Sequence, residues 1–262
     1  MAYVWAARPA MAVFAVLLCL AGVRLSGNLS RYSWVQLALY LSIIFLAVCA
    51  TMLYNDFCDR DRDKLKGKTL ASDNPAFLAA LCQKLWIVVG LLTGWVTALV
   101  SFWAALQIFA YICIGINYAR FYRIPCLALV SVAVCSAGPA ALGLLNAAPG
   151  KCGGCLVLLL CSMTAIASRE IIKDIEDVED DRGYKATLPV LIGVSRSRHV
   201  AAGVLYIFGG TVFYIDSPLR IASVVVLCAA GIWPLNFSEK KIKLSIDVVF
   251  IIVLSRLLFW PL

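Results

Sequence analysis

The sequence predicts an all-α integral membrane protein. Its 262 residues are 63% hydrophobic and only 15% charged, and the mean hydropathy is +0.91. A soluble domain of this size is about half apolar and about a quarter charged, so the excess indicates that lipid is the solvent of this chain. The apolar residues form long continuous runs without strand-like alternation, which predicts transmembrane helices.

Charged or turn-rich breaks divide the apolar runs into nine predicted spans. A helix needs roughly 20 residues to cross a hydrocarbon core about 30 Å thick, and the runs are close to that length. No gap between them could hold a soluble domain, so we expect a single domain over 1–262. The spans cover residues 10–25, 34–54, 77–97, 99–116, 126–146, 153–170, 200–215, 219–235 and 245–261.

The basic residues predict the orientation of these spans. With the N-terminus in the cytoplasm, most of the 23 Lys and Arg residues fall in cytoplasmic segments, in agreement with the positive-inside rule. The net charge of +8 therefore reflects basic cytoplasmic loops, and we expect membrane lipids and no nucleic acid as partners. The pair Cys152 and Cys155 is by itself only weak evidence for a metal or redox site, and an ordinary glycine-rich turn is the simpler interpretation.

Most of the 15 acidic residues lie in two short segments, 56–73 and 170–181, both on the predicted cytoplasmic side. Each segment directly follows a predicted span and places aspartates at positions i, i+3 and i+7. Those offsets share one face of a helix, so we expect two carboxylate stripes at the same membrane depth. The aspartates are Asp56, Asp59 and Asp63 in the first motif and Asp174, Asp177 and Asp181 in the second.

Carboxylates this close repel one another and are costly near lipid, so cations must compensate them. Mg²⁺ prefers carboxylate oxygens combined with substrate phosphates, and two facing Asp clusters suit a metal-bound diphosphate. Two solvated, charge-mixed loops are the alternative interpretation. The identical spacing of the two motifs, each at a helix end, favours the metal site.

The motifs Asn55–Asp63 and Lys173–Asp181 resemble those of the UbiA superfamily of intramembrane prenyltransferases, and the second is close to the digeranylgeranylglyceryl phosphate synthase branch. Shorter features of the family are also present, namely Arg8-Pro9, Tyr118 followed by Arg123, and Thr187-Leu188-Pro189-Val190 with Gly193. The sequence departs from the family pattern at Lys68-Thr69, at Tyr122 and at Ala128-Leu129.

This resemblance implies nine transmembrane helices around a central cavity that opens near the cytoplasmic face. It implies Mg²⁺-dependent transfer of a polyprenyl group from an allylic prenyl diphosphate to an aromatic or polar-lipid acceptor, through an allylic carbocation. A terpene cyclase of the same family, acting without an acceptor, is the main alternative. A cation-binding transporter is another, although it predicts acidic residues nearer the middle of the membrane.

The residues receive roles under this hypothesis. Those expected to act in catalysis are Asp56, Asp59, Asp174, Asp177 and Tyr118. Those expected to bind Mg²⁺ are Asp56, Asp59, Asp63, Asp174, Asp177 and Asp181. Those expected to contact the diphosphate are Asn55, Lys68, Arg123, Lys173 and Arg8. Those expected to shelter the carbocation are Tyr54, Tyr118 and Tyr122. Asp247 and Arg256, in the last span, are too far apart along one helix to pair directly and are expected to bond to neighbouring helices.

Overall fold

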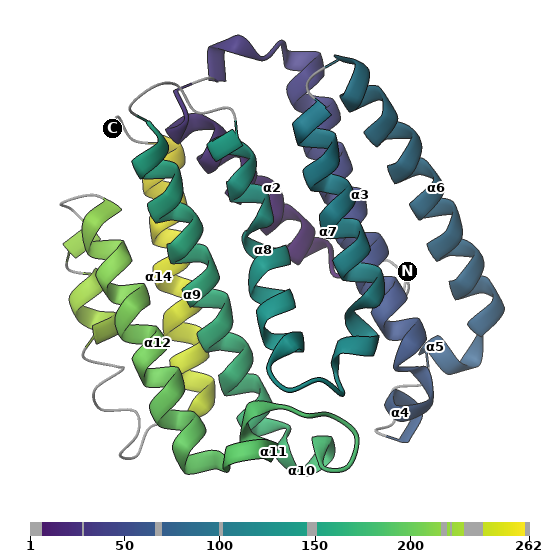
Figure 1. Ribbon diagram of the computed structural model, residues 1–262, viewed down its shortest axis with the longest axis vertical. Coiled ribbons are helices and arrows are strands. Elements are labelled where there is room, and N and C mark those ends of the chain that lie inside the picture. The colour runs from purple at the N-terminus through teal and green to yellow at the C-terminus, as the bar shows by residue number, and fades with distance from the viewer. Residues whose placement is uncertain are drawn as a thin grey trace. The chain divides into compact units, whose positions relative to one another are not determined.

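The computed structural model describes residues 7–27, 29–65, 70–99, 102–145, 151–215, 219–220, 222–227 and 238–259, and these residues are helical apart from short turns (Figure 1). The helices are α2 (Pro9–Leu25), η1 (Leu29–Arg31), α3 (Trp34–Cys58), α4 (Arg60–Leu65), α5 (Leu70–Asp73), α6 (Pro75–Leu99), α7 (Phe102–Phe121), α8 (Leu127–Leu145), α9 (Cys152–Glu176), α10 (Val178–Asp181), α11 (Leu188–Ile192), α12 (Val194–Ile215) and α14 (Glu239–Phe259).

The predicted all-helical class is confirmed over the described residues. Every predicted span except 219–235, which lies largely outside those residues, falls on one of these helices. By length and apolar composition, four helices of the described part can cross a membrane: Trp34–Cys58, Pro75–Val96, Cys152–Glu176 and Val194–Ile215. Three further apolar helices are shorter. The count of nine spans and the central cavity stay predictions.

The chain forms two compact units. The first comprises Met1–Cys19 with Leu29–Ala119, and the second comprises Leu20–Asn28 with Arg120–Leu262, so that α2 contributes to both. The first carboxylate motif belongs to the first unit and the second motif to the second. A single domain over 1–262 stays a prediction, and each unit is described by itself.

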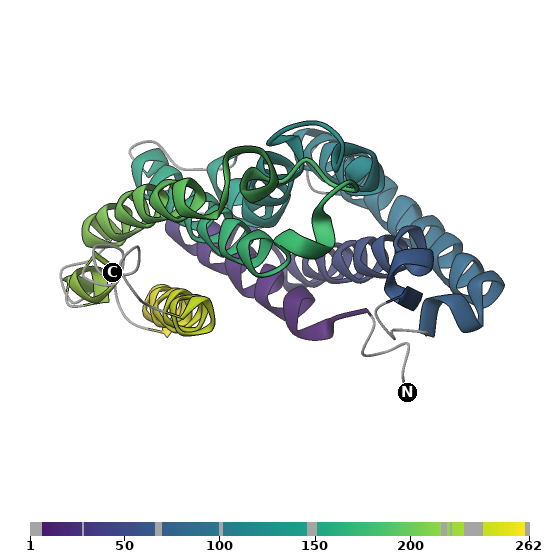
Figure 2. The ribbon, with the colours of Figure 1, turned by 90° about the horizontal axis from the view of Figure 1, so that it is seen from below.

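In the first unit, α3 and α6 lie side by side, and α5 closes their common end (Figures 1 and 2). The α3 helix begins at a capping box, in which the Gln36 amide donates to Ser33 Oγ and the Ser33 amide donates to Gln36 Oε1. Its far end packs through Leu53 against Leu78 and Cys82 of α6. This apolar cluster holds the helix end that carries the first motif.

In the second unit, α9 is the central helix and packs against α8, α12 and α14 (Figures 1 and 2). Small buried residues, among them Ser162, Ala165 and Ser168, line α9 and allow close approach of its neighbours. The last turns of α2 also pack into this unit, where Cys155 Sγ lies 3.7 Å from the carbonyl oxygen of Gly22. This contact gives Cys155 the structural role of a small buried side chain.

The contact between α2 and α8 gives the first testable prediction. A Cβ added at Gly22 would lie 2.6 Å from the backbone oxygen of Ala140, which no side-chain rotation relieves. We expect Gly22→Ala to destabilise the protein by roughly 1–3 kcal/mol through overpacking. Thermal unfolding in detergent micelles measures the loss.

Gly210→Ala is the matched control, because Gly210 lies inside α12 and a Cβ there meets no atom within 4 Å. Ala forms helix better than Gly by up to about 1 kcal/mol, so this variant should melt at the same or a higher temperature. Equal melting temperatures for the Gly22 variant and the unaltered protein would contradict the close approach.

Candidate functional site: two carboxylate motifs

The first motif begins in the last turn of α3 and bends at its second aspartate. The helix ends at Cys58, and Asp59 takes φ −89° and ψ 3° while its amide still donates to Asn55 O at 2.9 Å. The amide of Asp63, in α4, then donates to Asp59 O at 2.8 Å. The polar residues therefore continue the i→i−4 bonding pattern across the turn.

The second motif has the same local structure. The α9 helix ends at Glu176, Asp177 takes φ −93° and ψ 6°, and its amide donates to Lys173 O at 3.0 Å. The amide of Asp181, at the end of α10, donates to Asp177 O, also at 3.0 Å. The sequence predicted one helical face for each aspartate triplet, whereas the structure adds a turn at the middle aspartate of both.

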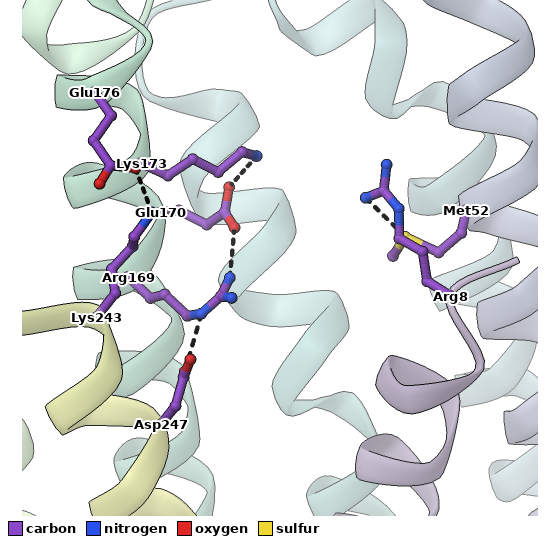
Figure 3. A network of polar contacts seen from close by, with 8 residues as sticks. All are labelled: Arg8, Met52, Arg169, Glu170, Lys173, Glu176, Lys243 and Asp247. Carbon is purple, nitrogen blue, oxygen red and sulfur yellow. Dashed lines mark hydrogen bonds and ion pairs between the residues drawn. The ribbon is translucent and has the colours of Figure 1, made fainter. Parts of the chain in front are cut away.

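Among the described residues of the first unit, Arg8 is a cation that pairs with the first aspartate of the first motif. Its Nη2 lies 3.0 Å from Asp56 Oδ1. Its Nη1 contacts Met52 Sδ at 3.6 Å, as Figure 3 shows. The backbone of Arg8 has φ 48°, a left-handed conformation that a non-glycine residue keeps only where the surroundings impose it. The predicted site residue Arg8 is thus directed at the first motif before α2 begins.

The other residues predicted near the first motif lie around this helix end. Asn55 Oδ1 is buried and has no hydrogen-bond partner among the described residues. Tyr54 packs against the apolar cluster of α3 and α6. Tyr118 is half-buried in the last turns of α7, and Lys68 lies outside the described residues.

In the second unit, Asp181 is fully buried, and Lys185 Nζ lies 3.6 Å from its Oδ1. The same ammonium group lies over the ring of Tyr122, 4.6 Å from its centroid. Tyr122 O accepts the Ala186 amide at 2.7 Å, which ties the loop after α10 to the turn after α7. One face of the predicted carbocation residue Tyr122 therefore already faces a cation, and Arg123 beside it is exposed.

The Thr187-Leu188-Pro189 signature forms the start of α11. Pro189 occupies the first turn, where a proline is tolerated, and the helix ends at Gly193 with φ 86° and ψ 156°. Only glycine adopts that conformation readily, and the Gly193 amide donates to Pro189 O at 3.0 Å. The fixed spacing from Pro189 to Gly193 therefore turns the chain from α11 directly into α12.

Four charged side chains form a row of contacts that ends at Lys173 of the second motif (Figure 3). Arg169 Nε contacts Asp247 Oδ1 of α14 at 3.0 Å, and Arg169 Nη1 lies 3.9 Å from Glu170 Oε1. Glu170 Oε2 in turn accepts from Lys173 Nζ at 3.1 Å. Asp247 thus bonds to a neighbouring helix, as expected. Glu170 and Lys185 were not among the predicted site residues, although each lies at helical spacing from an opposite charge in the motif.

The comparison with known proteins decides the family. A model described as the UbiA prenyltransferase family matches residues 10–245, which include both motifs. The chain belongs to the UbiA prenyltransferase family. This confirms the resemblance inferred from the motifs and, with it, the predicted class of prenyltransferase.

Two relatives in the family are named digeranylgeranylglyceryl phosphate synthase. A digeranylgeranylglyceryl phosphate synthase from Thermococcus kodakarensis is 33% identical over 166 residues, which are 61% of this chain and 58% of that protein. The protein of the same name from Pyrococcus horikoshii is 29% identical over 239 residues, covering 87% of this chain and 81% of its own. The chain therefore spans less than two thirds of the first relative and about four fifths of the second.

Solved structures share the UbiA fold at low identity. A structure of digeranylgeranylglyceryl phosphate synthase has a TM-score of 0.75 and 17% identity, with 98% of both chains covered. A UbiA homologue from Archaeoglobus fulgidus, solved with GPP and Mg²⁺, has a TM-score of 0.66 and 17% identity over the same share of both chains. At 17% sequence identity, this likeness shows a shared fold alone.

The donor atoms of each motif fit a hard divalent ion. Within the described residues, no three His, Cys, Asp or Glu side chains converge closely enough to hold a metal ion by themselves. Mg²⁺ does not need such a cage, because it is usually held by one or two carboxylates together with water and substrate phosphates. The buried Asn55 Oδ1 without a hydrogen-bond partner offers a further neutral oxygen beside Asp59.

The pairing of Asp181 with Lys185 gives the second testable prediction. Lys185→Met keeps the length of the side chain and removes its charge, which leaves the fully buried carboxylate less compensated. Removing one partner of a buried pair costs about 3 kcal/mol or more, so we expect a clear fall in melting temperature in micelles.

Arg182→Met is the control for this experiment. Arg182 pairs with Glu179 at 3.2 Å, but both side chains are more than half exposed. Exposed pairs contribute between zero and about 1 kcal/mol, so this variant should melt close to the unaltered protein. Equal losses for the two variants would show that burial of Asp181 is not what makes Lys185 necessary.

Proposed function

We propose that this protein transfers a polyprenyl group from an allylic prenyl diphosphate to an aromatic or polar-lipid acceptor inside the membrane. The observation that carries the proposal is the pair of carboxylate motifs, which have the same spacing and the same backbone turn at the ends of two apolar helices. Membership of the UbiA prenyltransferase family supports the reaction class.

The relatives support particular substrates. Two of them are named digeranylgeranylglyceryl phosphate synthase, which favours a polar-lipid acceptor of the glycerol-phosphate type. A homologue bound to GPP and Mg²⁺ supports a prenyl diphosphate donor and a magnesium cofactor. The prenyl tail would lie among the apolar helices, with the diphosphate at their polar ends.

The carboxylates of each motif would hold Mg²⁺ against a diphosphate. The ligands on the first motif would be Asp56, Asp59 and Asp63, assisted by Asn55, and those on the second would be Asp174, Asp177 and Asp181. When bound, the ions supply positive charge that stabilises the diphosphate leaving group. Asp56, Asp59, Asp174 and Asp177 are the residues on which the rate should depend most.

Cationic side chains would contact the remaining phosphate oxygens. Arg8 and Arg123 can bind two oxygens at once through their planar guanidinium groups, whereas Lys68 and Lys173 act as point charges. Arg8 pairs with Asp56, so its position depends on the first motif. Lys173 is held by Glu170 in the same way at the second.

Aromatic faces would shelter the allylic cation from water. Tyr54 and Tyr118 lie at the ends of α3 and α7, and electron-rich rings stabilise cations at close range. The ring of Tyr122 already contacts the ammonium group of Lys185 in this way. We assign Tyr122 both this contact and a contact with the allylic cation. Release of a proton from the acceptor then completes the transfer.

We propose that the N-terminus and both motifs lie on the cytoplasmic side of a multi-pass membrane protein. The distribution of Lys and Arg supports this orientation.

The third testable prediction concerns the register of the aspartates. Purified protein is incubated with Mg²⁺, a panel of allylic diphosphates and a panel of acceptors, and prenylated product is measured. We expect Asp56→Asn and Asp177→Asn each to lower kcat/KM by roughly 100-fold or more, because each removes a charge that stabilises the leaving group.

Asp61→Asn and Glu179→Gln are matched controls, since both acidic residues lie inside the motifs but off the i, i+3, i+7 register. Both side chains are at least three-quarters exposed, and both variants should keep nearly full activity. Full activity of Asp56→Asn or Asp177→Asn would contradict the assigned roles. A cyclic hydrocarbon formed without any acceptor would identify a terpene cyclase instead.

A further inference from the structure

Three of the charged residues of helix α14, namely Glu239, Lys243 and Asp247, are spaced at intervals of four residues. Residues so spaced lie along one face of a helix, here over about 12 Å at 1.5 Å per residue. The signs alternate along this face, from negative to positive to negative. We refer to these three residues as the charged face of α14.

Each residue of the charged face has an opposite charge on a neighbouring helix. Glu239 Oε1 accepts from Arg198 Nη2 of α12 at 2.5 Å. Lys243 Nζ donates to Glu176 Oε2 of α9, and Asp247 Oδ1 accepts from Arg169 Nε of α9 at 3.0 Å. Six side chains are therefore paired one to one between α14 and the two helices beside it.

Two of the three pairs reach the second carboxylate motif. Glu176 lies in sequence between Asp174 and Asp177. Arg169 contacts Glu170, which holds Lys173, as Figure 3 shows together with the pair formed by Lys243. Helix α14 thus engages the end of α9 at two points, one on each side of Lys173 and Asp174 in the chain.

The alternation of signs specifies a single register for α14. Between helices in lipid, apolar burial supplies little driving force, so polar contacts carry more of the specificity. A slide of α14 by four residues would place Lys243 against Arg198 and Asp247 against Glu176. Both contacts would bring like charges together. Repulsion therefore disfavours the shifted register, while the three ion pairs favour the observed one.

We infer that the charged face of α14 is a positioning element for the second carboxylate motif. It fixes Glu176 directly and Lys173 through Arg169 and Glu170, and so sets where the diphosphate-binding groups of α9 are held. The consequence for substrate binding rests on the proposed function, whereas the positioning itself does not.

The test exchanges the charges of one pair. Lys243→Glu and Glu176→Lys each place like charges together, and the double variant restores an ion pair with its direction reversed. We expect each single variant to raise the KM for the prenyl diphosphate and the half-saturating Mg²⁺ concentration by roughly three- to tenfold, the usual size of coupling between paired charges. The KM for the acceptor should not change, and the double variant should recover most of the donor KM.

A second readout does not depend on activity. Amide hydrogen exchange in the segment 173–181 should be faster in each single variant and should return towards the original rate in the double variant. Asp247→Asn removes one charge without introducing repulsion, so it gives the same measurement if Lys243→Glu folds poorly. Lys241→Glu is the control, because Lys241 is exposed on the same helix and carries the same charge.

The outcomes separate the two proposals. If the unaltered protein forms no prenylated product with any donor, the proposed function fails, and hydrogen exchange still tests the role of α14. If the unaltered protein is active but the single variants lose only folded protein, with donor KM and exchange in 173–181 unchanged, the inference is overturned. Absence of recovery in the double variant overturns it as well.

Discussion

Carboxylates at the end of an apolar helix must be compensated by cations within reach, and the local structure of both units depends on this constraint. Leaving a charge uncompensated near lipid or in a protein interior costs several kcal/mol, on the order of the whole stability of many domains. Arg8 meets the requirement at Asp56, Lys185 at Asp181, and Lys173 at Glu170. The left-handed backbone at Arg8 and the loop that carries Lys185 each place a cation beside a carboxylate.

The two motifs reach the same conformation from different sequences. Between its first and third aspartates, the first motif contains two arginines and the second motif two glutamates. Both motifs nevertheless turn at the middle aspartate and form the same backbone hydrogen bonds. A short side chain tolerates φ near −90° with ψ near 0°, so the turn costs little and directs the chain away from the apolar helix. The two motifs therefore share one local backbone structure, and this agreement carries the functional proposal.

Hydropathy predicted where the helices lie better than where they end. Span 153–170 corresponds to a helix that continues to Glu176, and span 200–215 to one that begins at Val194. Backbone hydrogen bonds extend through polar residues beyond the apolar boundary, and no apolar count detects them. The spacing of the aspartates could be predicted from the sequence, because helical spacing depends only on residues that are close along the chain. Arg8 and Asp56 are 48 residues apart and Arg169 and Asp247 are 78 apart, so only packing of the chain brings these partners together. Lys185 against Tyr122 was unpredictable for the same reason.

The charged face of α14 shows why a membrane protein retains ion pairs where apolar side chains would pack as well. Smooth apolar helices in lipid have several neighbouring registers of similar free energy, whereas alternating charges separate them. Binding of a diphosphate through metal ions is sensitive to displacements of about 1 Å, far less than one helical turn. Under the proposed function, α9 carries one set of binding groups and therefore needs a fixed position along its axis. Glu176 and Lys173 lie within the second motif, so the ion pairs of α14 act on the end of α9 that carries this motif. Apolar packing along the rest of α9 can therefore tolerate small shifts along the helix axis.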